Sequence, residues 1–251
     1  MTLHARALTT VLSIGLLSSA LSAVAATPPH WAYTGDKGAT HWGDIDASFA
    51  QCGLGHQQSP IDIAQTVKAE LPRLEFHYGS AAPTIWNNGH TVQVNLPAGN
   101  TLQVGDQTYE LLQFHFHTPS EERIKGKSQP MVLHFVHRNA AGELGVVAVL
   151  ARAGQANAAL SPVFAHLPRP GEKITVDELA LDLPALLPTS LGYYDFAGSL
   201  TTPPCSEGVH WMVLKTPVTL SARQIGAIRK LVGSNARPVQ PLNGREVKES
   251  E

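Results

Sequence analysis

The sequence predicts a mainly β protein of the α+β class with a single domain, and three observations support this fold class. From Leu74 onward, short runs rich in Val, Ile, Thr and aromatic residues alternate with turn signals, which is typical of β-strands. Segments with helical periodicity are few and short. The 251-residue chain contains no repeat, low-complexity run or linker, and it is long enough for one domain with a deep core.

The composition is that of an ordinary globular protein, with 43% hydrophobic and 15% charged residues and a formal net charge of -2. A balance so close to neutral argues against nucleic acid or an anionic membrane surface as a partner.

The first 25 residues have the features of a secretory signal peptide. Arg6 supplies the positive charge, residues 7–21 are apolar or small, and Ala23-Val24-Ala25 fits a cleavage signal. An uncleaved membrane anchor is the alternative, but the apolar run is short and contains several Ser and Thr. We therefore expect a signal peptide at residues 1–25, a mature domain at 26–251, no membrane anchor after cleavage, and a periplasmic or secreted location.

Export changes the interpretation of the two cysteines. Cys52 and Cys205 form an even pair in an oxidising compartment, which predicts one disulfide, with two buried free thiols as the alternative. Neither cysteine belongs to a Cys-x-x-Cys pair, so a redox or structural zinc role has no support.

The elements can be placed in order along the chain. Residues 28–54 show no period of 2 or 3.6 and predict an ordered irregular arm. Strands are expected at 84–87, 91–96, 101–104, 108–117, 131–136, 145–152 and 209–215, the last two central because their apolar runs are continuous. Turns are expected at Asn88-Gly89, Ala98-Gly99-Asn100 and Gly105-Asp106. Helices are expected at 156–166, 175–179 and 221–232, the last with Ser221 as N-cap and Gln224 completing a capping box.

Three histidines on two of these strands predict a metal site. Side chains alternate along a strand, so Gln113, His115 and His117 share one face. Two imidazoles on one face are costly in a core unless something satisfies them, and a metal ion does so well. His134 lies in the next strand, and residues 119–130 can turn the chain so that the two strands lie antiparallel. Because the chain has 12 histidines, a chance arrangement of satisfied core histidines is the alternative.

Two further stretches carry polar groups that would matter only near that metal. Ser199 to Cys205 includes two threonines followed by two prolines, a stiff extended loop whose hydroxyls can donate and accept hydrogen bonds. Asn88-Gly89-His90 places a histidine in a turn. Alone, each stretch reads as an ordinary surface turn.

Taken together in this order and spacing, these stretches resemble the α-class carbonic anhydrases over essentially the whole mature chain. The stretches that carry the resemblance are His41-Trp42-Gly43, Gln58 to Ile63, Asn88-Gly89-His90, Gln113 to His117, Ser120-Glu121, His134 to His137, Ser199 to Pro204 and Arg237 to Leu242. Thr118-Pro119-Ser120-Glu121 and the two cysteines are similar to the exported bacterial branch of the family.

The resemblance implies a fold, an activity and a cofactor. The fold would be one domain on a large, central, mostly antiparallel twisted sheet with a few short peripheral helices. The activity would be that of a lyase, the reversible hydration of CO₂ to bicarbonate and a proton through a zinc-bound hydroxide. The Zn²⁺ ligands would be His115, His117 and His134, with a fourth position left for water.

The resemblance also implies roles for residues around the metal. Thr201 would accept the hydroxide proton and donate its own to Glu121, which orients the attacking oxygen. His90 would relay protons to bulk solvent. The substrate pocket would be formed by Val136, Val146, Leu200, Thr202, Val209 and Trp211. An ordered water chain would be held by Tyr33, Asn88 and Gln93, and Gln113 would orient His115.

The chain departs from the family pattern at one pair of positions. The family usually carries Glu two residues before the third histidine and His or Asn just after the motif Glu, whereas this chain has Val132 and Glu122. Val132 has no acceptor, so we expect the Glu122 carboxylate to reach the nitrogen of His134 that does not bind metal.

Two other functions and one assembly state remain as alternatives. His115-x-His117-x-x-x-Glu121 with His134 also resembles the iron- or manganese-binding set of cupins, although Tyr109 stands where cupins usually have Gly. A carbonic-anhydrase-like binding module without catalysis is the second alternative, although no ligand histidine is missing. The sequence leaves the oligomeric state open, with a homodimer as one alternative.

Overall fold

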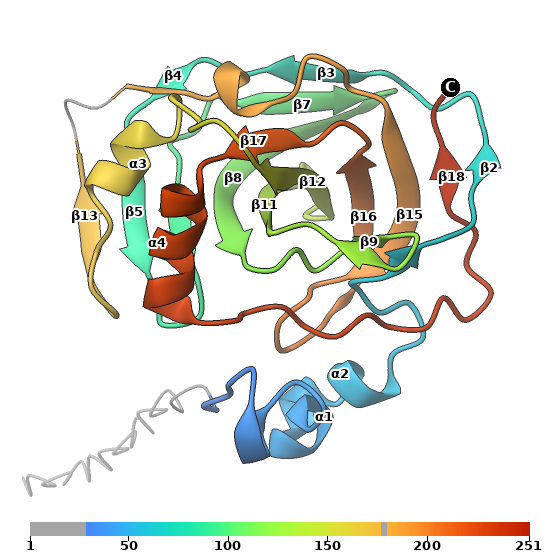
Figure 1. The fold of residues 1–251 in the computed structure, drawn as a ribbon. Helices are drawn as coiled ribbons and strands as arrows, with labels where there is room; N and C mark the ends of the chain where they lie inside the picture. Colours follow the sequence, from blue (N-terminus) through green and yellow to red (C-terminus); the bar gives the residue numbers. More distant parts are fainter. Residues whose placement is uncertain (1–28, 177–179) are drawn as a thin grey trace, which may run out of the picture.

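The architecture is a large twisted β-sheet with small helices at its periphery (Figure 1). The computed structural model describes residues 29–176 and 180–251. Within these residues the largest sheet has 13 strands, in the order β13-β5-β6-β8-β11-β12-β16-β15-β18-β2, with β3, β7 and β17 off this path. Most of its neighbours are antiparallel, and the pairs β12–β16, β12–β17 and β18–β2 are parallel. The predicted fold class is therefore confirmed.

The strands of the main sheet are short except at its centre. Their bounds are β2 Val67–Lys68, β3 Leu74–His77, β5 Thr84–Asn87, β6 Val92–Asn95, β7 Thr101–Val104, β8 Gln107–His117, β11 Met131–Asn139, β12 Leu144–Ala153, β13 Lys173–Thr175, β15 Tyr193–Ser199, β16 Glu207–Leu214, β17 Val218–Leu220 and β18 Lys248–Glu249. A three-stranded sheet is formed by β1 Asp62–Ile63, β9 Arg123–Ile124 and β10 Lys127–Ser128, and a two-stranded one by β4 Ser80–Ala81 and β14 Leu181–Asp182. The long apolar strands β12 and β16 are central, as predicted.

Helices occupy little of the described chain. They are the α-helices α1 Trp42–Ile45, α2 Gln51–Leu54, α3 Ser161–Ala165 and α4 Ala222–Val232, with the 3-10 helices η1 Gly35–Lys37, η2 Ala47–Phe49 and η3 Pro184–Leu186. No helix in the described ranges is long and apolar enough to cross a membrane. The N-terminal helices gather below the sheet, whereas α3 and α4 lie at its side (Figure 1).

The predicted helix at 221–232 is confirmed together with its capping box. The Ser221 hydroxyl accepts from the Gln224 backbone N–H at 3.2 Å, and the Gln224 side chain accepts from the Ser221 backbone N–H at 3.1 Å. These contacts satisfy backbone donors at the helix start that have no partner inside the helix.

The other two helix predictions and the irregular arm need correction. The predicted helix 156–166 is reduced to Ser161–Ala165, since the Asn157 side chain accepts from the Leu160 N–H in a turn and Pro162 favours a helix start. Thr175 ends strand β13, and residues 177–179 of the predicted helix 175–179 lie outside the described residues, as does the predicted signal peptide. The N-terminal arm is built of helical turns of three or four residues, too short to show a period.

The two faces of the central strands bury different apolar clusters. On β11, Met131, Leu133 and Phe135 belong to the larger cluster, while Val132 and Val136 belong to a smaller one on the opposite face. His134 lies between Val132 and Val136 in this alternation. The sheet thus separates its main core from the face that carries the histidines.

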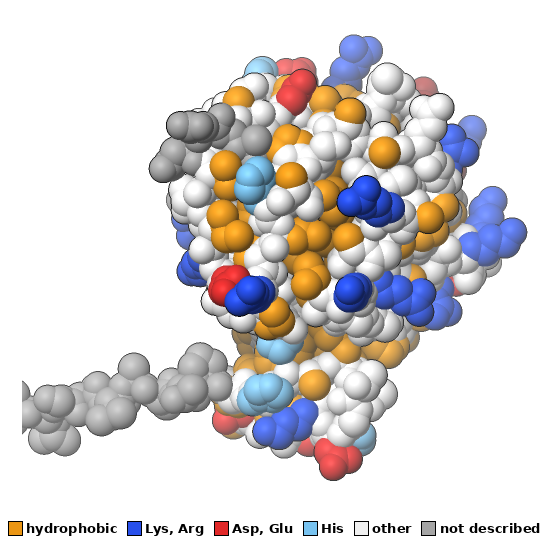
Figure 2. All heavy atoms as spheres, turned by 60° about the vertical axis from the view of Figure 1, so that its left-hand side comes forward, with side chains coloured by type: hydrophobic (Ala, Val, Ile, Leu, Met, Phe, Trp, Pro, Cys, Tyr) orange, Lys and Arg blue, Asp and Glu red, His pale blue; other side chains and the backbone are white. Residues whose placement is uncertain are grey.

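Charged side chains are spread over the surface in the view of Figure 2. Lys, Arg, Asp and Glu are dispersed there, with hydrophobic side chains exposed between them. On this face the acidic side chains do not gather in one patch.

The predicted disulfide is present and ties the N-terminal arm to the loop after β15. Cys52 of α2 is bonded to Cys205 across a sequence separation of 153 residues. Both cysteines are buried in a third apolar cluster with Trp42 and Phe49. The arm is thereby held against the body of the protein.

Removing this bond should lower stability. The chain-entropy treatment gives at most about 5 kcal/mol for a loop of this size, and residual structure in the unfolded chain reduces it. Cys205→Ser should therefore unfold at a clearly lower urea concentration than the parent under oxidising conditions. Reductant should move the parent midpoint toward that of the variant and leave the variant unchanged. Equal midpoints under oxidising conditions would contradict the stabilising role.

A buried histidine outside the metal-facing surface should make stability depend on pH. His137 on β11 accepts from the Tyr78 hydroxyl at 2.5 Å and donates to the Gly145 carbonyl at 3.3 Å, which suits a neutral ring. Burial lowers the pKa of His137 from 6.5 to about 4. Between these values the unfolded chain binds the proton more readily, so stability falls as pH drops from 6.5 toward 4, by about 3 kcal/mol from this group.

The contribution of His137 can be measured by urea unfolding at several pH values. His137→Gln should lose less stability than the parent between pH 6.5 and 4, whatever its stability at neutral pH. His77→Gln, at an exposed position, is the matched control and should keep the parent slope. The same slope in His137→Gln and the parent would show that His137 does not titrate in this range.

Candidate metal centre

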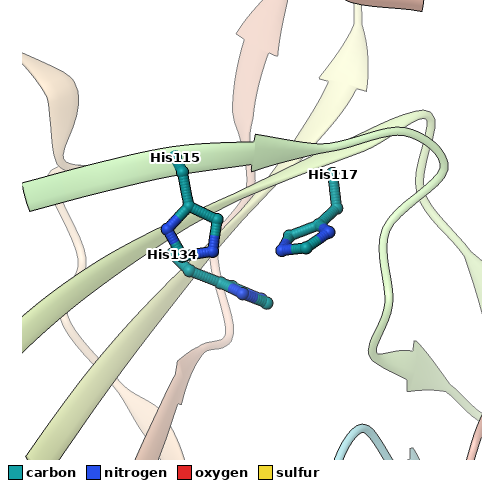
Figure 3. A group of neighbouring side chains, drawn as sticks. All are labelled: His115, His117 and His134. Carbon is teal, nitrogen blue, oxygen red and sulfur yellow. The ribbon is translucent and has the colours of Figure 1, made fainter. Parts of the chain in front are cut away.

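Two adjacent strands bring three histidines to one point. His115 and His117 lie on β8 and His134 on β11, and the antiparallel register sets His134 directly opposite His115. One nitrogen from each ring lies within 4.8 Å of the others. The rings of His115 and His117 point to the same side of their strand, toward the ring of His134 (Figure 3).

The other nitrogen of each ring has its own acceptor. His115 Nδ1 lies 2.9 Å from the Gln113 side-chain oxygen, and His117 Nδ1 lies 2.7 Å from the Asn235 carbonyl. His134 Nε2 lies 3.0 and 3.2 Å from the two oxygens of Glu122. Donation to these acceptors leaves the lone pairs of His115 Nε2, His117 Nε2 and His134 Nδ1 directed at the common point. The contact between Glu122 and His134 expected from the sequence is thus present.

The residues fit a metal ion. His117 Nε2 is buried and has no hydrogen-bond partner in the structure, which is costly unless a ligand satisfies it. Three neutral imidazoles that converge beside an open cleft form the donor set of a catalytic rather than a structural zinc site, since a structural site would close the fourth position.

Burial keeps two of the rings ready to bind a cation. It lowers the pKa of His115 to about 3 and that of His117 well below 6.5, and in both cases the nearby His134 adds to the effect. Burial also acts to lower the pKa of His134, but the carboxylates of Glu122 and Glu121 outweigh it and the net shift is upward. A metal binds to the neutral ring, so His115 and His117 need not lose a proton first.

The site opens into a cleft of about 170 Å³ with one apolar and one polar side. Val136, Val146, Leu200 and Trp211 form the apolar side, and the Trp211 ring stands edge-to-face with His134 at 4.9 Å. The polar positions are Tyr33, Asn88, His90, Gln93, Thr201 and Thr202.

Val209 is the one predicted pocket residue that does not line this cleft. It is buried in the same apolar cluster as Val136 and Trp211. It packs with two residues of the apolar wall, and its assignment to the substrate pocket stays a prediction.

Glu121 and Thr201 form a buried pair at the edge of the histidine cluster. Two donors face the Glu121 carboxylate: the Arg237 backbone N–H donates to one oxygen at 2.8 Å, and the Thr201 hydroxyl lies close enough to lower the pKa of Glu121. The other oxygen is buried without a hydrogen-bond partner. One Glu121 oxygen lies 3.4 Å from His117 Nε2. Burial raises the pKa of Glu121 to about 7, and the Glu122 carboxylate adds to this, while His134 and the two donors act in the opposite direction.

His90 lies in the polar rim of the cleft. The Asn88 side chain accepts from the backbone N–H groups of His90 and Thr91, both at 2.9 Å, and fixes the turn. The His90 ring stacks on Trp31 with centroids 3.7 Å apart. Partial burial and the neighbouring His30 lower the pKa of His90.

Three residues of the site had no role assigned from the sequence. Asn235 accepts from His117 through its carbonyl, and its amide also donates to the His90 carbonyl at 3.0 Å. Arg237 holds Glu121 through its backbone N–H, and Trp31 stacks on His90. Backbone groups far along the chain leave no side-chain pattern, so Asn235 and this contact of Arg237 could not be found from spacing.

The fold and this cluster define a class: a β-sheet metalloenzyme whose three-histidine centre lies in the floor of a half-apolar cleft. A family model described as eukaryotic-type carbonic anhydrase matches residues 37–251. A carbonic anhydrase of Pectobacterium atrosepticum is 46% identical over 231 residues, covering 92% of this chain and 95% of that protein.

Solved structures agree with this family. An α-carbonic anhydrase from Thermovibrio ammonificans, solved in complex with sulfanilamide, matches with a TM-score of 0.86 at 42% sequence identity. The α-carbonic anhydrase of Photobacterium profundum matches with a TM-score of 0.83 at 49% identity. Each comparison covers 88% of this chain and 100% of the other chain. The chain belongs to the α-carbonic anhydrase family, whose function is the zinc-dependent hydration of CO₂. The cupin and the inactive binding module are not favoured.

Proposed function

We propose that this protein is a carbonic anhydrase that converts CO₂ and water reversibly to bicarbonate and a proton, with Zn²⁺ as its metal. The observation that carries the proposal is that three histidine rings, each oriented by its own hydrogen-bond acceptor, converge at a cleft with an apolar wall. Each part of that cleft offers what one stage of the reaction needs.

The proposed metal ligands are His115 Nε2, His117 Nε2 and His134 Nδ1. An all-nitrogen set of this kind suits Zn²⁺. Glu121, which a cupin would use as a further ligand, instead accepts from the Arg237 backbone N–H through one oxygen. When bound, zinc would supply a water acidified to a pKa of about 7, for which carbonic anhydrase is itself the reference example.

The pair Glu121 and Thr201 would orient the attacking oxygen. With its only proton directed to Glu121, the Thr201 hydroxyl would face the cleft only as an acceptor. It would therefore accept a hydrogen bond from the nucleophile and turn the nucleophile's lone pair toward the substrate. The Arg237 N–H keeps the carboxylate in place for this role.

The apolar side of the cleft would hold the substrate. CO₂ is apolar, so Val136, Val146, Leu200 and Trp211 can contact it without competing for a hydrogen bond. Thr202 lies at the same opening and its hydroxyl would contact the bicarbonate product. Val209, which is buried in the same apolar cluster, would belong to this wall as well.

Proton release would use the polar side. His90 is half-buried at the rim, where an imidazole can take up a proton from inside and release it to solvent. Tyr33, Asn88 and Gln93 line the same cleft as His90 and the three histidines and would hold the waters that carry the proton.

The protein would act outside the cytoplasm. The bonded cysteine pair fits an oxidising compartment. Together with the sequence of residues 1–25, it supports export to the periplasm or the medium and a catalytic domain at 26–251.

Loss of one ligand should abolish both metal binding and activity. The mature parent should hold one zinc per chain and hydrate CO₂ in a stopped-flow assay. His117→Ala removes one of three ligands, so most of the zinc and the activity should be lost. His77→Ala, at an exposed position, is the control and should match the parent. Full activity in His117→Ala would refute the assignment of the centre.

Replacement of His90 should separate turnover from CO₂ capture. His90→Ala should lower kcat by up to about 100-fold in dilute buffer, because proton export follows conversion of CO₂. The ratio kcat/KM should stay near the parent value, and imidazole buffer should restore part of kcat. Parent-like turnover of His90→Ala in dilute buffer would show that protons leave by another route.

A further inference from the structure

The third histidine has an acceptor that comes from outside the two ligand strands. Glu122 lies in the segment that joins β8 to β11, and its side chain is fully buried. Both of its oxygens lie within 3.2 Å of His134 Nε2, and His134 is the only ion-pair partner that the described residues give it. Such a carboxylate is costly to bury unless its charge is used.

The two ligand strands differ at the equivalent position. On β8, Gln113 lies two residues before His115, on the same face, and supplies the acceptor for its ring. On β11, the residue two before His134 is Val132, which is fully buried in an apolar cluster and has no acceptor. Glu122 therefore supplies to His134 the hydrogen-bond acceptor that Gln113 supplies to His115.

The segment that carries Glu122 is fixed by contacts of its own. The Ser120 hydroxyl donates to the Glu122 carbonyl at 2.8 Å and accepts from the Gln129 N–H at 2.9 Å. The next residue, Arg123, begins β9, which pairs with β1 and β10. At the tip of the β9–β10 hairpin, the Gly126 N–H donates to Asp62 at 2.9 Å. The three-stranded sheet thus sets the place of the carboxylate.

We infer that Glu122 is the positioning residue for His134: it accepts the Nε2 proton and so directs the Nδ1 lone pair to the metal. The segment that leads into β9 is thereby part of the metal centre through Glu122, whereas the β9–β10 hairpin only supports that segment. This inference rests on the proposed zinc enzyme and specifies how that enzyme holds its ion.

Zinc affinity tests the inference without use of activity. Purified mature protein would be stripped of metal and titrated with Zn²⁺ against a chromophoric chelator. Glu122→Ala should bind zinc about 10- to 100-fold more weakly than the parent, the usual effect of losing an orienting partner. Glu122→Gln keeps an acceptor but not the charge, so its zinc affinity should lie between those of the parent and Glu122→Ala. Lys127→Ala on the same hairpin and Glu110→Gln on β8 are matched controls and should keep the parent affinity.

Relocating the carboxylate distinguishes positioning from a general structural effect. Val132 shares its face with His134, so a carboxylate there can reach the same ring. Glu122→Ala combined with Val132→Glu should regain most of the lost affinity. Val132→Glu alone should not exceed the parent, because two adjacent buried carboxylates repel each other.

A failure to fold can be told apart from a loss of positioning. If circular dichroism shows that Glu122→Ala does not fold, the zinc affinities of Glu122→Gln and of Glu122→Ala combined with Val132→Glu test whether Glu122 positions His134. Parent-like zinc affinity in Glu122→Gln and Glu122→Ala, or no recovery in a folded relocated variant, would overturn the inference while the zinc site stands. A parent that binds no zinc would overturn the proposed function as well.

Discussion

The antiparallel pairing of β8 with β11 is the constraint on which the rest of the site depends. It sets His134 opposite His115 and Val132 opposite His117. Since side chains on a strand alternate, a slip of one residue would move the rings of one strand to the opposite face. The phenylalanines on the other face hold the register: Phe114 stacks on Phe135 across the strands, with centroids 5.1 Å apart. Packing in the main core therefore fixes the positions of the three histidines on the opposite face of the sheet.

The rings also need fixed orientations, and three different sources supply them. An amide side chain from the same strand holds His115, a backbone carbonyl from the segment after α4 holds His117, and a carboxylate from the segment between the two ligand strands holds His134. All three acceptors leave one nitrogen free and pointed inward. Because the sources are independent, a change in one part of the chain can disturb one ligand without moving the other two.

The sequence was sufficient to predict those features that depend on local pattern. The central strands, the capping box of α4, the three histidines and the disulfide were predicted because each rests on spacing or on a pair of residue types. The Glu122 contact was predicted from a departure from the family pattern. The helical turns of the arm were missed because three or four residues show no period. The role of Asn235 was missed because its carbonyl acts, and every residue has one. The assignment of Val209 to the substrate pocket came from the family resemblance alone, and the structure shows only that it packs in the same apolar cluster as Val136 and Trp211.

Arg237 has a consequence for where the chain can be shortened. Its guanidinium donates to the carbonyls of Cys52 and Ser59, while its backbone N–H holds Glu121. Together with Asn235 it gives the active centre two contacts from the last 17 residues of the chain. The centre is incomplete without residues 235–237, so the segment after α4 is no dispensable tail. A truncation that removes these residues would take away the acceptor for His117 and the backbone donor for Glu121.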